Sequence, residues 1–164
     1  MTKIGLISDT HSHLDCSVAG YFKGCDEIWH AGDFGAIGVA ESLAVIAPLR
    51  GVYGNIDWQD IRAVYPERLH FTCEDVHVFM QHIGGYPGRY APGVKTGIEV
   101  NKSNLFISGH SHILKIMFDQ KLQCLHMNPG AAGKQGWHKV ITLIRFSIDG
   151  KDIKDAEIVE IGPR

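Results

Sequence analysis

Lys3–Ser8 (KIGLIS) is a short apolar run that leads directly into the polar cluster Asp9-Thr10-His11-Ser12. Such a run before a polar cluster is typical of a buried strand that opens into a loop. The pattern recurs in Asp26–His30 (DEIWH) before Ala31-Gly32-Asp33, and in Leu49–Tyr53 (LRGVY) before Gly54-Asn55-Ile56-Asp57. The segments between these runs can form helices, over Leu14–Lys23 and Ala36–Ala47. This β-α-β-α-β order predicts parallel strands joined by helical crossovers.

The rest of the chain is richer in strands than in helices. A Gly- and Pro-rich loop over Gly84–Gly93 leads into an expected helix at Pro92–Asn101. The expected strands are Arg68–Thr72, Val76–Gln81, Leu105–Ser108, Lys115–Asp119, Leu122–Met127, Val140–Phe146 and Ile153–Ile161. No repeat, low-complexity tract or linker divides the chain. Residues 1–164 are therefore expected to form a single α/β domain with an antiparallel, strand-rich C-terminal half.

Length and composition exclude several classes of protein. The 164 residues suit one domain and are too few for a (β/α)₈ barrel, which needs about 250. With 16 basic and 18 acidic side chains the net charge is -2, so no overall positive field attracts nucleic acid or anionic lipid. No apolar run reaches the roughly 20 residues that cross a bilayer. The 4 cysteines have no C-x-x-C spacing and the N-terminus lacks a signal segment, which favours a cytoplasmic protein.

Histidine is unusually frequent, with 10 residues where a chain of this length carries roughly four. Because ligands bind at the carboxyl ends of strands in open α/β sheets, polar residues that follow the expected strands should converge. These residues are Asp9, His11, Asp33, Asn55, His82, His110 and His112. Taken singly, each cluster is as well explained by a loop, a turn or a helix cap. Taken together, carboxylates, an amide and imidazoles without thiolates suit Mn²⁺, Fe²⁺, Zn²⁺ or Ni²⁺, and seven ligands suit two ions.

The order of these motifs resembles that of the calcineurin-like metallophosphoesterases. D-x-H follows the first strand, G-D the second and G-N the third, and a later histidine precedes G-H-x-H. The short YfcE-type phosphodiesterase branch is the most similar, including its Asn128-Pro129-Gly130, and the resemblance covers essentially the whole chain. It implies a four-layer α/β sandwich of the metallo-dependent phosphatase type, with mixed sheets and two divalent metal ions at one sheet edge. Mn²⁺ is the first expectation, with Ni²⁺, Fe²⁺ or Zn²⁺ as alternatives.

The resemblance also implies how the two ions are held and used. One ion would be bound by Asp9, His11 and His112. The other would be bound by Asn55, His82 and His110, and Asp33 would bridge the two ions. A hydroxide between the ions would attack phosphorus, which places Asp33 and Asn55 among the catalytic residues. The implied enzyme is a hydrolase of phosphoric diesters acting on a small phosphate ester, with a phosphomonoesterase as an alternative. The oligomeric state stays open, a homo-oligomer included.

Three departures from the family pattern bear on catalysis. Larger members carry a proton-donating histidine after the metal-binding Asn, where this chain has Ile56, so good leaving groups and diesters are expected to be favoured. His13 stands where the short branch has a small or apolar residue, and it is either a catalytic proton donor or a loop residue without a role. The usual His-Gly-His element is reduced to His82-Ile83-Gly84-Gly85.

Other residues near the motifs have two interpretations each. His30 and His126 either hydrogen-bond a ligand from behind or are simple strand residues, whereas His70, His77 and His138 are expected at the surface or in strands. Trp58, Tyr86 and Tyr90 either line a substrate pocket or pack at its rim. The rival function is a non-catalytic scaffold such as the retromer subunit of the same fold, whose metal site has decayed. A nuclease is disfavoured because the chain has no basic stripe.

Overall fold

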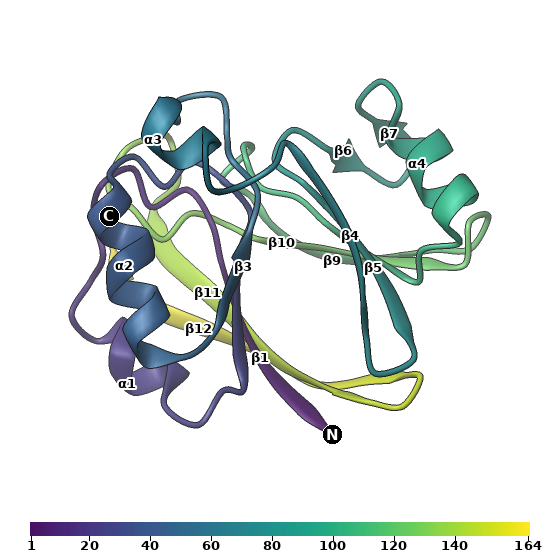
Figure 1. Ribbon diagram of the computed structural model, residues 1–164, viewed down its shortest axis with the longest axis horizontal. Coiled ribbons are helices and arrows are strands. Elements are labelled where there is room, and N and C mark those ends of the chain that lie inside the picture. Colours follow the sequence, from purple (N-terminus) through teal and green to yellow (C-terminus); the bar gives the residue numbers. More distant parts are fainter.

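The computed structural model describes residues 1–164, and most of the chain folds into two five-stranded sheets (Figure 1). The parallel strands of the first sheet are β1 (Thr2–Ile7), β2 (Glu27–His30) and β3 (Leu49–Gly51). The crossovers between them contain helices α1 (Val18–Phe22) and α2 (Ile37–Ile46). Two antiparallel strands, β11 (Val140–Asp149) and β12 (Asp152–Pro163), extend the sheet beyond β1, which gives the order β12-β11-β1-β2-β3.

The second sheet is built from the middle of the chain. Its strands are β4 (Arg68–Cys73), β5 (Val76–Gln81), β8 (Leu105–Ile107), β9 (Leu114–Asp119) and β10 (Cys124–Pro129), in the order β4-β5-β8-β10-β9. Between β5 and β8 the chain forms a small hairpin, β6 (Gly85–Tyr86) and β7 (Arg89–Tyr90), and then helix α4 (Val94–Asn101). Strands β5, β8 and β10 run parallel, so this sheet is mixed as well.

Three apolar clusters divide the molecule into layers. The largest lies between the two sheets and includes Leu6, Trp29 and Met80, all fully buried. A second cluster packs α1 and α2 against the outer face of the first sheet, and a third packs α4 against Phe79 and Phe106 of the second. Figure 1 shows α1 and α2 on one side of the molecule and α4 on the other. The expected four-layer α/β sandwich with mixed sheets is confirmed, because each sheet buries both faces.

The local differences from the expected elements have identifiable causes. Helix α1 begins at Val18 instead of Leu14 because the Asp15 carboxylate accepts hydrogen bonds from the amide and hydroxyl of Ser17, a turn that competes with helix. The expected loop Gly84–Gly93 contains the β6–β7 hairpin, whose turn has Pro87 followed by Gly88 at φ 88°.

Other boundaries differ by a few residues. Strand β3 ends at Gly51, two residues before the expected Tyr53, and β10 continues to Pro129. The single-turn helix α3 (Gln59–Arg62) was not expected from the sequence. None of the helices is long and apolar enough to span a bilayer.

Candidate metal centre

The polar motifs all lie where strands end. Asp9 and His11 follow β1, Asp33 follows β2 and Asn55 follows β3. From the second sheet, His82 follows β5, and the pair His110 and His112 follows β8. Because β1, β2 and β3 are parallel, as are β5 and β8, their carboxyl ends meet at one edge.

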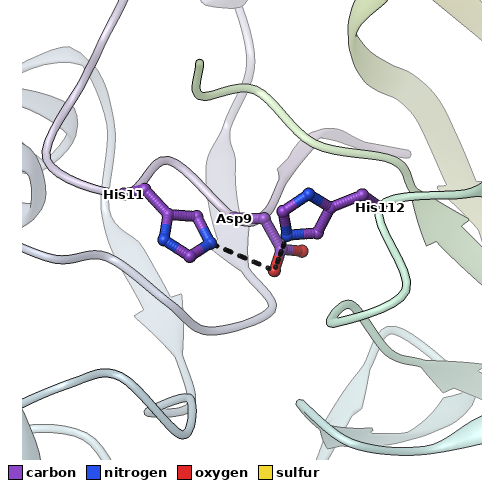
Figure 2. Close-up of side chains that lie close together, drawn as sticks. All are labelled: Asp9, His11 and His112. Carbon is purple, nitrogen blue, oxygen red and sulfur yellow. Dashed lines mark ion pairs between the residues drawn. The ribbon is translucent and has the colours of Figure 1, made fainter. Parts of the chain in front are cut away.

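One group of candidate ligands is Asp9, His11 and His112, whose ligand atoms all lie within 4.8 Å of one another. Figure 2 shows the Asp9 carboxylate between the two imidazole rings. Asp9 Oδ1 is 3.2 Å from Nε2 of His112 and 3.9 Å from Nε2 of His11. The three side chains therefore converge on one point, as the sequence indicated.

The second group is Asp33, His82 and His110, which meets the same distance criterion. Nε2 of His82 is 3.1 Å from Asp33 Oδ2 and 3.1 Å from Oδ1 of Asn55, so the amide oxygen joins this group. Asp33 Oδ2 is also 3.5 Å from Nε2 of His11 in the first group. The Asp33 carboxylate thus reaches both groups.

Hydrogen bonds from one hydroxyl and two backbone amides orient the carboxylates. Asp9 Oδ2 accepts from the Ser8 hydroxyl at 2.6 Å and from the His110 amide at 3.1 Å. Asp9 Oδ1 is buried and accepts no hydrogen bond. The ring nitrogen Nε2 of His11 is also buried and has no hydrogen-bond partner. Asp33 Oδ1 accepts from the Ile56 amide at 3.1 Å, which leaves Oδ2 directed at the histidines.

The tautomers of two histidines follow from their partners. His82 Nδ1 lies 2.7 Å from the Ala31 carbonyl, which can only accept, so Nδ1 carries a proton, and Nε2 has the lone pair when the ring is neutral. His138 Nε2 donates to the Gly133 carbonyl at 2.8 Å, so its Nδ1 accepts from Nδ1 of His112 at 3.3 Å. His112 Nε2 therefore also presents a lone pair, toward Asp9 Oδ1.

This donor set fits a pair of divalent cations. When the rings are neutral, lone pairs of imidazole nitrogens face lone pairs of carboxylate and amide oxygens at 3.1 to 3.2 Å, and Asp9 Oδ1 is buried without a donor. No Lys or Arg forms an ion pair with Asp9 or Asp33, so their buried charges lack a basic partner other than histidine. Nitrogen and oxygen ligands without sulfur suit Mn²⁺, Fe²⁺, Zn²⁺ or Ni²⁺.

The pKa shifts in the second group show how a proton occupies that geometry when no cation does. Burial would lower the pKa of His82, but the hydrogen bond to Asp33 and the charges of Asp9 and Asp33 raise it above its ordinary value. Burial would likewise raise the pKa of Asp33, but His82 lowers it. A cation bound here would displace that proton, because a ligating imidazole must be neutral.

The backbone of the ligand loops is unusual. Among the non-glycine residues with positive φ are Asp9 (53°), His11 (46°), Asp33 (58°), His110 (67°) and His112 (58°). Side chains rarely tolerate this left-handed region, and residues held there cluster at functional sites. Gly54 serves the same loops through close approach, because a Cβ at this position would lie 1.9 Å from Asp33 Oδ1.

Two supporting residues were not identified from the sequence. His138 was expected at the surface or in a strand, but it lies in a loop and orients His112 as described above. Asp57 is buried, and its carboxylate accepts from the amides of Phe34 (3.2 Å), Gly35 (2.8 Å) and Gly54 (2.8 Å). Asp57 thereby ties the loop after β2 to the loop after β3. Its presence in the Gly54–Asp57 motif was the only available signal.

The other residues that the sequence singled out near the motifs do not join the two ligand groups. His30 is fully buried, and burial lowers its pKa to about 3, so the ring is neutral. It bonds the Gly32 amide and the Thr10 hydroxyl, which are loop groups and not candidate ligands. His13 is half-buried and makes no side-chain hydrogen bond to a candidate ligand, while its Nε2 is buried without a partner. The exposed Ile56 side chain stands beside Asn55.

Comparison with known sequences gives a family match over most of the chain. A family model described as the calcineurin-like phosphoesterase superfamily domain matches residues 2–151. A probable metallophosphoesterase from Methanothermobacter thermautotrophicus is 29% identical over 167 residues, which cover 97% of this chain and 92% of the relative.

Solved structures share the fold at lower identity. An archaeal phosphodiesterase superposes with a TM-score of 0.75 at 22% identity, covering 96% of this chain and 100% of the other. Vps29 from Entamoeba histolytica, solved in complex with zinc, gives a TM-score of 0.74 at 14% identity over 97% of this chain and 99% of its own. Similarity at this level of identity shows the arrangement of the layers.

Proposed function

Because the chain belongs to the calcineurin-like phosphoesterase superfamily, we propose that it is a metal-dependent phosphodiesterase that hydrolyses small phosphate esters. The supporting observation is the position of Asp33, whose Oδ2 lies 3.1 Å from His82 Nε2 of one ligand group and 3.5 Å from His11 Nε2 of the other. A carboxylate shared by two groups of nitrogen and oxygen ligands suits two cations, with Mn²⁺ the first candidate.

Each residue of the centre has a role in this proposal. Asp9, His11 and His112 would hold one ion and Asn55, His82 and His110 the other, with Asp33 common to both. When bound, two divalent ions activate a water molecule as the nucleophile and offset the charge of the phosphate. The chain contributes only two carboxylates against neutral imidazoles and one amide, so the loaded centre keeps a positive charge that attracts the anionic ester. This explains how a protein with net charge -2 can bind a phosphate.

The side chain after Asn55 limits the range of substrates. Ile56 cannot protonate a departing oxygen, and a general acid contributes about 10² to 10⁴ in rate. Esters whose leaving group departs as a stable anion should therefore react fastest, and diesters faster than alkyl monoesters. We propose His13 as the proton donor for poorer leaving groups because it lies two residues after His11 in the same loop; since its Nε2 is buried, the ring would have to turn to reach a substrate.

The experiment is hydrolysis of bis-p-nitrophenyl phosphate and p-nitrophenyl phosphate with added Mn²⁺, Ni²⁺ or Zn²⁺. We expect metal-dependent turnover, the diester ahead of the monoester, and a loss of at least about a hundredfold in Asp33→Ala and His112→Ala. His77→Ala is the matched control, since His77 is an exposed β5 residue whose side chain hydrogen-bonds only Thr72. His13→Ala should slow alkyl esters and spare p-nitrophenyl esters.

Two results would change the assignment. If neither ester is turned over with any of the metals, the enzyme function is rejected in favour of a non-catalytic scaffold. The fold shared with Vps29 makes that role the alternative. Turnover of the monoester well above the diester would make the protein a phosphomonoesterase and would show that Ile56 imposes no limit.

A further inference from the structure

A cavity of about 270 Å³ opens beside His110, next to the candidate metal centre. Its walls come from the chain after β5, the β6–β7 hairpin, the loop after β8, the start of β9 and strand β10. The residues whose side chains matter below are Ile83, Tyr86, Arg89, Ile113, Lys115 and His126. Because His110 lines the cavity and also belongs to the second ligand group, an ester held at the metal centre would extend one of its substituents into this space.

The charged side chains in the cavity wall are all basic. Lys115 and Arg89 line it, and no Asp or Glu does. Neither cation forms an ion pair with a carboxylate. Asp119, four residues along β9 from Lys115, already accepts hydrogen bonds from the Tyr90 hydroxyl at 2.7 Å and from the amides of Lys121 and Leu122. The positive charge of the wall is therefore not neutralised from within the protein.

The ammonium group of Lys115 is held in place. Its Nζ lies 3.9 Å from the centroid of the Tyr86 ring, a cation–π contact, and its stem is half-buried. Behind it, His126 is buried, and burial together with Lys115 lowers the pKa of His126 to about 4, so this ring adds no charge. A fixed ammonium group without a carboxylate partner is suited to receive an anion.

The mouth of the cavity is apolar. Ile83 and Ile113 are 43% and 60% exposed, and each directly follows a candidate ligand, His82 or His112. Exposed isoleucines at this position favour a short carbon chain between the phosphate at the metal centre and any group deeper in the cavity.

We propose that this cavity binds the second alcohol of the diester and selects one that carries its own negative charge, a carboxylate or a further phosphate. The substrate class is thus a small phosphodiester with an anionic substituent. This inference rests on the proposed phosphodiesterase function. It specifies the second alcohol, which stays on the phosphate after the leaving group departs and lies beside His110. Lys115 and Arg89 are its specificity residues.

The test uses four p-nitrophenyl diesters that share one leaving group and differ in the second alcohol: ethanol, 3-hydroxypropionate, ethylene glycol monophosphate or choline. We expect kcat/KM with Mn²⁺ to be at least about tenfold higher for one or both anionic esters than for the ethyl ester, and lowest for the cationic choline ester. The carboxylate and phosphate arms identify which anion is preferred. Equal rates for the ethyl and anionic esters would overturn the proposal.

Variants separate the charge from the architecture. Lys115→Met keeps the length of the side chain and should reduce the preference for the anionic esters over the ethyl ester by about tenfold or more. Arg89→Met should act in the same direction. Lys151→Met is the matched control, because Lys151 lies in the exposed turn between β11 and β12. A Lys115→Met variant that slows all four esters equally would show a structural role and contradict the assignment.

Binding in the cavity can be tested even if the proposed phosphodiesterase function is wrong. If none of the esters is hydrolysed, they are stable ligands, and calorimetry with the Mn²⁺-loaded protein measures their dissociation constants directly. Tighter binding of the anionic esters, lost in Lys115→Met, would then support the cavity as a binding site although the enzyme assignment had failed. Equal affinities in that experiment would reject the cavity as well.

Discussion

Two buried aspartates beside the ligand loops are expected to respond in opposite directions to the same substitution, Asp→Asn. Asp9 Oδ2 has two donors, Ser8 Oγ and the His110 amide, whereas Oδ1 has none and lies 3.2 Å from His112 Nε2. In Asp9→Asn the amide oxygen can take both donors, and the NH₂ group can donate to His112. Without metal, removal of this poorly compensated buried charge should raise the free energy of unfolding by about 1–2 kcal/mol.

Asp57 is the matched case, equally buried but fully satisfied. Its oxygens accept from three backbone amides, those of Phe34, Gly35 and Gly54. In Asp57→Asn one of the two terminal atoms becomes a donor and must face an N–H, so a charge-assisted hydrogen bond is lost and two donors are brought together. The free energy of unfolding should fall by about 1.5–3 kcal/mol.

Thermal unfolding in EDTA and in Mn²⁺ measures both effects. One kcal/mol shifts Tm by about 2–4 °C for a chain of this size, so Tm in EDTA should rise by about 2–8 °C in Asp9→Asn and fall by about 3–12 °C in Asp57→Asn. Mn²⁺ at a hundredfold excess over its Kd stabilises by about 2.7 kcal/mol per site. Wild type and Asp57→Asn should show this increase at both sites, and Asp9→Asn should lose the contribution of the site that contains Asp9, about half of the total.

Two results for Asp9→Asn would refute this account of the Asp9 carboxylate. An Asp9→Asn variant that melts below wild type in EDTA would show that its carboxylate is stabilising without a metal. An unchanged Mn²⁺ response in that variant would remove Asp9 from the centre.

Three further changes have defined outcomes. Ile56→His should raise activity on alkyl phosphate esters by about tenfold or more and hardly alter p-nitrophenyl esters, because only poor leaving groups need a proton; equal gains on both in rate assays would contradict this. Gly54→Ala places a Cβ 1.9 Å from Asp33 Oδ1 and should weaken Mn²⁺ binding at least about tenfold by calorimetry, whereas the control Gly38→Ala meets nothing within 4 Å and should leave it unchanged. The N-terminal amine, the Gly150 amide and the Thr2 hydroxyl bond Glu74 and lower its pKa from 4.5 to about 2, so they stabilise the fold above pH 4.5 and this stability is lost as pH falls toward 2. Urea unfolding of Glu74→Gln should lack that slope, and a slope equal to wild type would refute the linkage.

The position of the candidate ligands could be predicted because it depends on chain direction alone. Each ligand follows an apolar run, and parallel strands end on the same side of a sheet, so Asp9, Asp33 and Asn55 had to meet. The same reasoning held for His82 and His110 in the second sheet, where β5 and β8 are parallel. The four-layer fold followed from the resemblance and is confirmed.

The supporting contacts could not be predicted because they depend on side-chain approach across loops. His138 has no apolar run before it, and it reaches His112 only because the chain passes so close that a Cβ at Gly136 would lie 2.1 Å from His112 Nδ1. Asp57 stood in a motif, but its three donors come from two different loops. Neither relation leaves a periodic signal in the sequence.

The left-handed ligand residues explain how the centre keeps its shape. Five of the ten non-glycine residues with positive φ are candidate ligands, and this conformation costs about 1–2 kcal/mol for each. The loops hold one another there: the amides of His11 and Ser12 donate to the carbonyls of Asp33 and Phe34 at 3.0 and 2.8 Å, and the Gly133 amide donates to the Asp9 carbonyl at 3.0 Å. A backbone fixed by such bonds does not need a metal to order it. Binding therefore carries little ordering cost, and the strain is stored in the fold to aim the ligands before a cation arrives.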